Sequence, residues 1–307
     1  MTEDSVSATA IKAPAKLNLG LEVLGRRADG YHDLATIFLT VSLYDHLVFR
    51  SDPPSGTVNG GTGALSCESD APELESGNLV LTALQRLQEA TGYPVSAHVE
   101  LQKSIPIASG LGGASSDAAA VLLAARQRFR IEIDDAALAR VAASLGSDVP
   151  FLLEGGCALG TGRGDVLSPL PAPDCVQFVL VTPPIHIPMK TETLYRTLDA
   201  ANFTDGSHVA AQAARLRAGT GLDNRLLVNA FSSPLYEIVT ELASLPDTLT
   251  SLGAPVVALS GSGPTHYVPF QDPDQASAFA LRATARFGQR TRIALVTPVP
   301  ARAKSTP

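Results

Sequence analysis

The sequence predicts an α+β fold with two lobes, each containing a sheet covered by helices. Apolar residues alternate in some segments and recur every three or four positions in others, so strands and helices mix without a repeating period. The 307 residues are 45% hydrophobic and 17% charged, which suits a soluble chain with one or two cores. A proline-rich segment, 168–174, lies mid-chain and predicts a division into residues 1–167 and 168–307.

The first half of the chain contains alternating segments that predict strands at 11–23, 36–49 and 95–102. Its helical patterns predict helices at 78–90, at 116–129, and from an Asp134 N-cap to Gly146. Turn residues predict a turn at 26–30, an irregular loop at 51–76 and a short hairpin at 151–159.

The second half predicts strands at 176–182 and 292–297, and a strand pair that flanks residues 260–264. Helices are predicted at 191–198, 224–239 and 275–287. Because no segment repeats at a fixed period, a repeat architecture is not expected.

Composition narrows the classes of partner. The net charge of −7 and the pI near 5.4 argue against a nucleic acid or a membrane surface, since both attract basic proteins. The acidic, polar start is unlike a signal peptide, and no apolar run approaches the ~20 residues of a membrane helix. Cys67, Cys157 and Cys175 form no CxxC spacing, so a disulfide framework or zinc site is not expected. The cysteine usage favours a reducing cytoplasm.

The segment IASGLGGASSDAAAV, residues 107–121, is glycine-rich at one end and alanine-rich at the other. A strand is predicted before it and a helix within it, so the amides at the helix start form a candidate anion site. A P-loop of the GxxxxGK[ST] type is excluded, because Ala114 and not lysine follows Gly113.

Two other interpretations of this glycine segment differ in their ligand. A dinucleotide fingerprint would use Gly110 and Gly112, but Ser115 stands at the third glycine position. The acidic residue it needs about 20 residues later would be Asp134, which a helix cap explains equally well. A phosphate loop of backbone amides, with the Ser115 and Ser116 hydroxyls as added donors, is favoured over this fingerprint and over a plain connecting turn.

Five sequence motifs carry a resemblance to a known family. PIASGLGGASS at 106–116 resembles PxxxGLGxSS, the ATP-binding motif of the GHMP kinases. APAKLNL at 13–19, RADGYH at 27–32, GSDVPF at 146–151 and SGSGP at 260–264 occur in the same order as in one branch of that superfamily. This branch phosphorylates a cytidine-diphosphate-linked methylerythritol in non-mevalonate (MEP) isoprenoid synthesis. Each motif alone is weak, but together they extend over nearly the whole chain.

The resemblance implies a fold, a reaction and a nucleotide. The fold would be that of the GHMP kinases, with an N-terminal lobe like ribosomal protein S5 domain 2 and a ferredoxin-like C-terminal lobe. The reaction would be ATP-dependent phosphorylation of the substrate's 2-hydroxyl. Mg²⁺ is expected because the phosphates need neutralisation, although no carboxylate can be assigned to it. The implied ATP-binding residues are Pro106, Ile107, Ala108, Ser109, Gly110, Leu111, Gly112, Gly113, Ala114, Ser115 and Ser116. Alternatives are another GHMP small-molecule kinase and a dinucleotide-dependent oxidoreductase.

The resemblance also implies that Lys16 and Asp148 form the catalytic pair. An adjacent ammonium keeps an aspartate ionised and oriented, and orienting the hydroxyl matters most in a loose phosphoryl-transfer transition state. Lys16 would stabilise the charge that develops on the phosphoryl group. Because Asp148 lies between Gly146 and Pro150, we expect a stiff turn there, with Val149 extended.

Substrate-binding residues follow from the same resemblance. Asn18 lies on the same strand face as Lys16, where it can bond the substrate's polyol or the lysine's neighbours. Tyr31 would stack on cytosine and His32 would read the base edge, although a surface aromatic beside a solvated histidine is the plainer alternative. The other implied residues are Phe38 (pocket wall or core), Tyr195 (second stacking aromatic), and Gly261, Ser262 and Gly263 in the third glycine loop.

Overall fold

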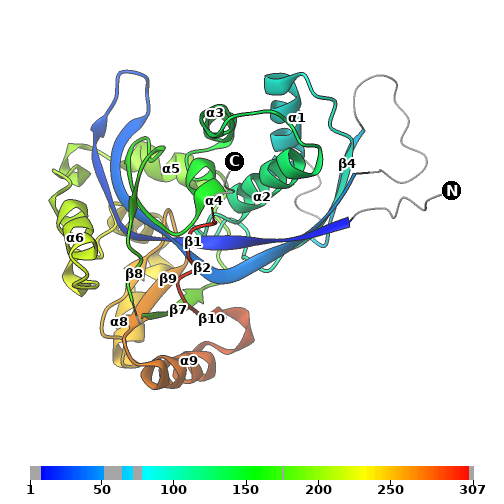
Figure 1. Cartoon of the computed structure of the whole chain (residues 1–307). Coiled ribbons are helices and arrows are strands. Elements are labelled where there is room, and N and C mark those ends of the chain that lie inside the picture. The colour runs from blue at the N-terminus through cyan, green and yellow to red at the C-terminus, as the bar shows by residue number, and fades with distance from the viewer. Residues whose placement is uncertain (1–7, 52–63, 72–77, 175, 304–307) are drawn as a thin grey trace. The chain divides into compact units, whose positions relative to one another are not determined.

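The computed structural model describes residues 8–51, 64–71, 78–174 and 176–303 (Figure 1). Its backbone contacts group the chain into two compact units. Unit 1 comprises residues up to 15, 44–107 and 112–154, and unit 2 comprises residues 16–43, 108–111 and 155–307. This grouping cuts the chain elsewhere than the predicted division at residue 168, which stays a prediction.

Two long strands, β1 (Ala8–Arg26) and β2 (His32–Arg50), supply residues to both units. In unit 1 the end of β2 pairs antiparallel with β4 (Ala97–Gln102), which in turn pairs parallel with β3 (Leu65–Ser69). The prediction of an irregular loop at 51–76 is therefore wrong at β3. This strand is only five residues long, and its pairing with β4 supplies what its local pattern does not. Residues 52–63 and 72–77 lie outside the described residues.

Four helices of unit 1 pack against one another: α1 (Leu79–Thr91), α2 (Gly113–Arg128), α3 (Asp135–Leu145) and α4 (Val149–Glu154) (Figure 1). The central helix α2 is buried along most of its length. Alanines at 118–120 are fully buried, and their small side chains allow α1 and α4 to approach α2 closely.

The predicted helix starts rest on side-chain caps. The Asn78 side chain accepts a hydrogen bond from the Val80 amide at 2.9 Å, and Asp134 accepts one from the Ala137 amide at 2.6 Å. The predicted Asp134 cap is confirmed, and the Asn78 cap is seen only in the structure. Helix α2 begins at Gly113, three residues before the predicted start, directly after Gly112 with a φ of 72°.

The predicted hairpin at 151–159 is wrong. Residues Val149–Glu154 form α4, and only Cys157–Gly162 form a strand, β5. Pro150 is the second residue of α4, where its missing N–H is not needed and its fixed φ suits a helix. Val149 is the first residue of this helix, so the expectation of an extended Val149 is wrong. Gly155 and Gly156 then turn the chain with φ values of 69° and 76°.

Unit 2 contains two groups of strands. The first part of β2 pairs antiparallel with β5, and β5 pairs with β6 (Val166–Leu170). The proline-rich segment thus begins inside a strand. A four-stranded antiparallel sheet has the order β10 (Arg292–Val296), β7 (Gln177–Thr182), β9 (His266–Phe270) and β8 (Ala258–Leu259).

The helices of unit 2 are α5 (Lys190–Thr197), α6 (Ser207–Arg217), α7 (Ser232–Ile238), α8 (Leu245–Ser251) and α9 (Pro273–Phe287). The single helix predicted at 224–239 is wrong. A 3₁₀ turn at Asn224–Leu226 and helix α7 replace it. Asn229 breaks the helix because its side chain donates to the Leu259 and Gly261 carbonyls, each at 2.9 Å, and accepts from the Phe231 amide.

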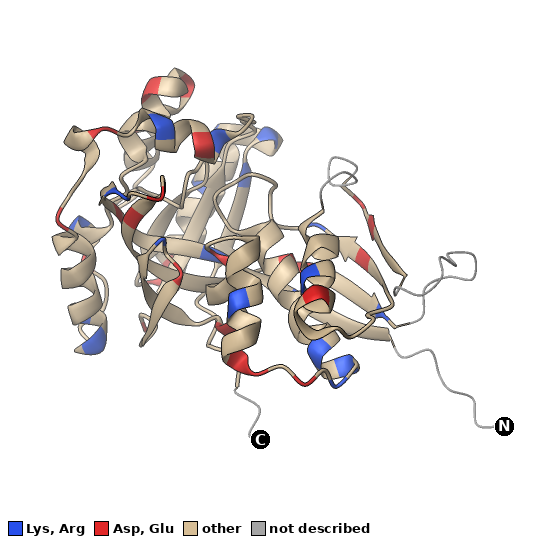
Figure 2. Cartoon of the chain, turned by 90° about the horizontal axis from the view of Figure 1, so that it is seen from above, with Lys and Arg blue, Asp and Glu red and all other residues tan. Residues whose placement is uncertain are grey.

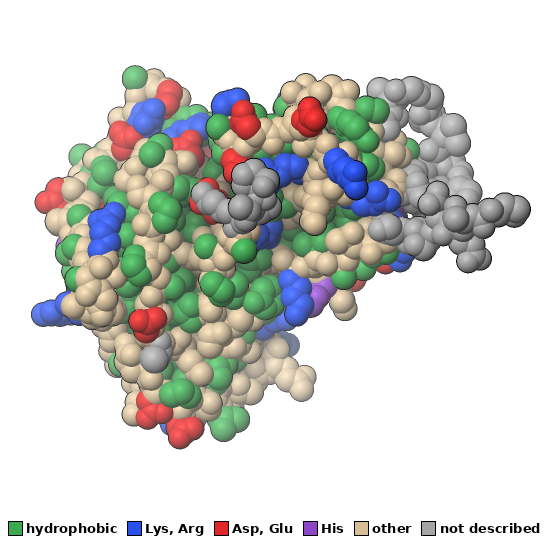
Figure 3. All heavy atoms as spheres, viewed as in Figure 1, with side chains coloured by type: hydrophobic (Ala, Val, Ile, Leu, Met, Phe, Trp, Pro, Cys, Tyr) green, Lys and Arg blue, Asp and Glu red, His purple; other side chains and the backbone are tan. Residues whose placement is uncertain are grey.

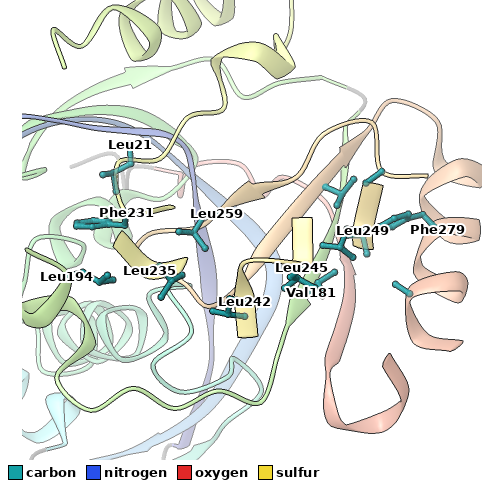
Figure 4. Close-up of a cluster of buried hydrophobic side chains, with 14 of the residues drawn as sticks. Leu21, Val181, Leu194, Phe231, Leu235, Leu242, Leu245, Leu249, Leu259 and Phe279 are labelled. Carbon is teal, nitrogen blue, oxygen red and sulfur yellow. The ribbon is translucent and has the colours of Figure 1, made fainter. Parts of the chain in front are cut away.

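A buried hydrophobic cluster joins these elements (Figure 4). Leu21 of β1 lies near Phe231, which directly precedes α7, and near Leu235 of α7. Phe279 of α9 lies at the other end of the cluster. Leu194 is the buried apolar residue of α5 and belongs to the same cluster. It therefore anchors the helix that begins at Lys190.

Charges of both signs are interspersed along the chain, and hydrophobic side chains on the face in view are scattered among polar ones (Figures 2 and 3). In the described segments, none of the helices is long and apolar enough to cross a membrane. Cys67 and Cys157 are free thiols, and Cys175 lies outside the described residues.

Candidate active site

Lys16 is held in a chain of buried hydrogen bonds. It lies on β1 with 4% of its surface exposed, and its Nζ donates to Asn18 Oδ1 at 2.8 Å. The Asn18 amide donates to Thr36 Oγ1 at 2.8 Å, and Thr36 donates to the Gly20 carbonyl at 2.7 Å. Because its Nδ2 is engaged, Asn18 keeps Oδ1 turned toward the ammonium. The predicted placement of both residues on one strand face is confirmed.

The ring of Phe38 lies beside the same ammonium. Lys16 Nζ is 5.8 Å from the ring centroid, within the range of a cation–π contact. Phe38 is 2% exposed and also packs against Gly160, where an added Cβ would lie 2.7 Å from the ring. Phe38 therefore serves the core and the surroundings of Lys16 together.

We call residues 106–116 the first glycine segment and residues 260–264 the third glycine loop or segment, after the order of these motifs in the GHMP kinases. The third glycine loop approaches Lys16 closely. A Cβ added to Gly261, which has a φ of 53°, would lie 3.1 Å from Lys16 Nζ and 3.0 Å from the Gly110 carbonyl oxygen. A side chain would therefore press into the ammonium or into the first glycine segment. Ser262, the next residue, exchanges a hydrogen bond with Thr191 at 3.0 Å.

Within unit 2 the first and third glycine segments meet backbone to backbone. A Cβ on Gly110 would lie 2.2 Å from the Ser260 carbonyl oxygen, so only glycine fits. Ser260 Oγ donates to the Gly110 carbonyl at 3.1 Å, and the Thr265 amide donates to the Ser109 carbonyl at 3.1 Å. The Lys16 amide donates to the Leu111 carbonyl at 2.9 Å. These bonds bring Lys16 and both glycine segments into one cluster.

The rest of the first glycine segment belongs to unit 1, where it opens helix α2. Gly112 precedes this helix without a side-chain cap, so its first amides remain available to an anion. Ala114 is exposed and Ser115 is half-buried. Ser116 is buried, and its hydroxyl donates to the Pro14 carbonyl at 2.7 Å. That hydroxyl already has a backbone partner and is not a spare donor in this arrangement.

The glycine segment fits a phosphate. Ser109 is 3% exposed, and its Oγ has no hydrogen-bond partner in the described part of the chain. Buried hydroxyls are normally paired, and a phosphate oxygen would supply the missing acceptor. Ile107 is exposed and Pro106 is half-buried before the segment turns inward. Among the described residues no group of three His, Cys, Asp or Glu could hold a metal ion.

Asp148 lies in the tight turn between α3 and α4. The Val149 amide donates to the Gly146 carbonyl at 3.2 Å, and the Asp148 carbonyl accepts from the Leu152 amide at 3.1 Å. The predicted turn is thus confirmed, but its extended Val149 is not. Lys16 and Asp148 belong to different compact units, and their pairing stays a prediction.

A second polar cluster lies in unit 1 around Lys103, and within the described residues its Asp117 Oδ1 has no hydrogen-bond partner. Lys103 Nζ donates to Asp45 at 2.5 Å and to Asp117 at 2.7 Å. Asp45 also accepts from the Ser104 and Ile105 amides, at 2.6 Å and 2.8 Å. Burial lowers the pKa of Lys103, but the two carboxylates outweigh it and raise that pKa above its usual value. Burial raises the pKa of Asp117 to about 7 against the opposing effect of Lys103.

The residues implied in cytosine binding lie in unit 2. His32 stacks on Tyr195 with ring centroids 5.0 Å apart and an interplanar angle of 22°, and Tyr195 meets Phe231 edge-on at 4.9 Å. Burial, with a contribution from Arg26, lowers the pKa of His32, so its imidazole is neutral at pH 7. A neutral imidazole offers one donor and one acceptor to a base edge.

Tyr31 is 56% exposed and carries a cation on its ring. The Arg163 guanidinium lies 4.9 Å from the ring centroid, and Asp165 orients Arg163 through a contact at 2.8 Å. Motif analysis missed Arg163, although its place in the turn Gly162-Arg163-Gly164-Asp165 was visible. It also missed Thr36 and Lys190, whose contacts arise only in the folded chain.

Comparison with known proteins gives the class first. The family described as "GHMP kinases N terminal domain" matches residues 78–156, which contain the first glycine segment and Asp148. The crystal structure of L. major mevalonate kinase in complex with R-mevalonate aligns with a TM-score of 0.69, covering 98% of this chain and 100% of that chain. At 18% identity this likeness shows the fold alone. Together with the relatives described next, the family match shows that the protein is a small-molecule kinase with the GHMP fold, and kinases of this class use ATP.

More similar relatives define the family within that class. A protein of Dehalococcoides mccartyi is 37% identical over 265 residues, 86% of this chain and 90% of its own length. One of Pseudarthrobacter chlorophenolicus is 35% identical over 303 residues, 94% and 92% of the two chains. Both are named 4-diphosphocytidyl-2-C-methyl-D-erythritol kinase. A crystal structure of that kinase aligns at 33% identity with a TM-score of 0.74, covering 94% of this chain and 99% of its own. The chain belongs to the 4-diphosphocytidyl-2-C-methyl-D-erythritol kinase family, which confirms the resemblance carried by its motifs.

Proposed function

We propose that this enzyme transfers the γ-phosphoryl group of ATP to the 2-hydroxyl of 4-diphosphocytidyl-2-C-methyl-D-erythritol, a step of non-mevalonate isoprenoid synthesis. Family membership supports the substrate. The observation that carries the proposal for the site is the cluster in which Lys16 and two glycine segments meet. The amides and the ammonium supply what a polyphosphate needs.

ATP would bind along residues 106–116. Its phosphates would accept from the amides at the start of α2 and from the partnerless Ser109 hydroxyl. Mg²⁺ would neutralise phosphate charge while bound to the phosphates themselves, as this ion usually is.

Asp148 would orient the substrate hydroxyl and accept its proton as the oxygen bonds to the γ-phosphorus. The bond from that phosphorus to the β–γ bridging oxygen breaks, and ADP leaves with the bridging oxygen. Lys16 would stabilise the charge on the transferring group. Asn18, fixed by Thr36, would hold the Lys16 ammonium in the required orientation.

The cytosine would stack on Tyr31 and Tyr195, with the neutral His32 bonding its edge and Phe38 closing the pocket near Lys16. Gly261, Ser262 and Gly263 would contact the substrate from the third loop. We further infer a cytoplasmic enzyme, monomeric or weakly dimeric, with no nucleic-acid or membrane partner.

A coupled ADP-release assay tests this function. The enzyme is supplied with MgATP and, in parallel, the cytidine diphosphate substrate, galactose, homoserine and mevalonate. We expect rapid turnover with the cytidine substrate alone. Faster turnover with another acceptor would assign a different GHMP kinase activity. Calorimetric binding of NAD but not of an ATP analogue would favour the oxidoreductase alternative.

A further inference from the structure

Lys190 bridges the two glycine segments of unit 2. It is the first residue of α5 and is 6% exposed. Its ammonium donates to the Ala108 carbonyl in the first segment and to the Gly263 carbonyl in the third. Among the described residues no carboxylate pairs with it. The lysine therefore binds only backbone, and it does so at both segments.

The backbone on both sides of this contact is strained. Ala108 has a φ of 52° and Met189 a φ of 46°, two of the three positive-φ non-glycine residues in the described ranges. Such conformations persist where the surroundings impose them, and they cluster at functional sites. The Met189 side chain is 69% exposed, so its own burial does not explain the strain. The positive φ of Met189 instead directs the next residue, Lys190, into the protein interior.

The charge on Lys190 is uncompensated. Its acceptors are carbonyl dipoles, and the second positive group nearby is Lys16. Burial and the charge of Lys16 together lower the pKa of Lys190 to about 8. A bound polyanion would relieve the unfavourable burial of the Lys190 ammonium.

We propose that Lys190 is a positioning residue for phosphoryl transfer, which clamps the first and third glycine segments together through the Ala108 and Gly263 carbonyls. This inference rests on the proposed kinase function. Without the clamp, the segment from Ala108 to Gly110 loses a fixed point, and the donors beside it, including Ser109, no longer converge on the phosphates. A displacement of about 1 Å in such a site can lower the rate on the order of 10²-fold.

Steady-state kinetics test the clamp with a matched control. Lys190→Met removes the ammonium and keeps the aliphatic stem. Arg196→Gln removes a positive charge from the exposed side of the same helix. We expect kcat to fall about 10-fold or more in Lys190→Met, with KM for the cytidine substrate nearly unchanged and both parameters near wild type in the control. Lys190→Arg, which keeps a charged donor, should recover part of kcat. A folded Lys190→Met enzyme with the kinetics of the control overturns the proposal.

Spectroscopy on the wild-type protein gives a test that does not depend on the folding of a variant. The chain has five lysines, so ¹³Cε-lysine resonances are few, and Lys190→Arg assigns the one in question. A non-hydrolysable ATP analogue should raise the pH at which Lys190 titrates, because phosphates favour its charged form. A Lys190 resonance that saturating analogue leaves unmoved would overturn the clamp. Wild-type enzyme that releases no ADP with the cytidine substrate would refute the proposed function instead.

Discussion

Lys103 in unit 1 and Lys190 in unit 2 have little side-chain exposure but opposite surroundings. Lys103 in unit 1 contacts the carboxylates of Asp45 and Asp117, which raise its pKa. Lys190 in unit 2 contacts only backbone carbonyls, and burial beside Lys16 lowers its pKa. The ammonium of Lys103 is thus compensated by carboxylates, whereas the ammonium of Lys190 has no opposite charge beside it.

This difference separates stability from function. A buried ammonium with paired carboxylates needs no ligand, and its loss would leave those carboxylates unpaired. A buried ammonium that has no anionic partner and lies beside glycine-rich backbone can bind a polyanion. Its removal should lower the rate of the reaction more than the stability of the fold. The predictions below test this separation.

The largest effect is expected from Lys103→Met. Removing this ammonium leaves Asp45 and Asp117 buried without their partner, so the free energy of unfolding should fall by about 3–5 kcal/mol. Urea denaturation measures it. Arg126→Gln, which breaks the exposed pair with Asp135 in the same unit, is the control and should cost less than about 1 kcal/mol. A loss no larger than in the control would mean that the Lys103 cluster is not the paired structural element described above.

Substitutions in the proposed catalytic pair should act on turnover. We expect kcat to fall about 10²-fold or more in Asp148→Asn and in Lys16→Met, the usual size of a general-base loss. The analogue of ATP should still bind. The double variant should lose far less than the product of the two, because the residues act as a unit. A fully active Asp148→Asn enzyme would move the catalytic assignment elsewhere.

Tyr31→Ala should affect binding of the cytidine substrate in unit 2 but not binding of ATP near Lys16 and Lys190. Loss of one stacking ring should weaken binding of the cytidine substrate by about 1–3 kcal/mol and leave ATP-analogue affinity unchanged. Calorimetry of both ligands measures this, with Tyr93→Ala as a control outside the proposed pocket. Equal loss of both ligands would place Tyr31 outside the cytidine site.

The smallest effect concerns pH. Burial lowers the pKa of Lys190 from 10.5 to about 8 in the folded chain. Between these two values the unfolded chain binds more protons than the folded chain, so the contribution of Lys190 to the free energy of unfolding rises with pH. The Lys103 contribution has the opposite sign. Its folded pKa is raised, so the contribution is complete below about 10.5 and is lost as pH rises through the folded value. Between pH 7.5 and 9.5, wild type should gain roughly 1 kcal/mol relative to Lys190→Met in urea titrations. A difference that stays constant with pH would contradict the charge assigned to Lys190.

Much of the fold was predictable from local pattern. The apolar pattern located β1, β2, β4, β7, β10 and the helix α1, and the Asp134 cap located α3. The errors occur where distant contacts decide. β3 forms only through β4, and the Asn229 side chain ends a helix by bonding to Leu259 and Gly261. Helices α6 and α8 were not predicted at all.

The site was predictable as far as short motifs extend. Lys16 and Asn18 lie together because strand spacing places them on one face. Lys190 contacts carbonyls 82 and 73 positions away in the chain, and no local pattern encodes those contacts. Thr36 was missed for the same reason.

The most direct test of the central claim is ³¹P NMR of the products formed by the wild-type enzyme from MgATP and the cytidine diphosphate substrate. The account predicts one new phosphomonoester resonance, from a phosphate on the 2-oxygen of the methylerythritol, whose carbon carries no proton. One ADP should form for each phosphomonoester, and the diphosphate of the substrate should remain intact. Absence of that resonance, or its appearance only with mevalonate or homoserine, would contradict it.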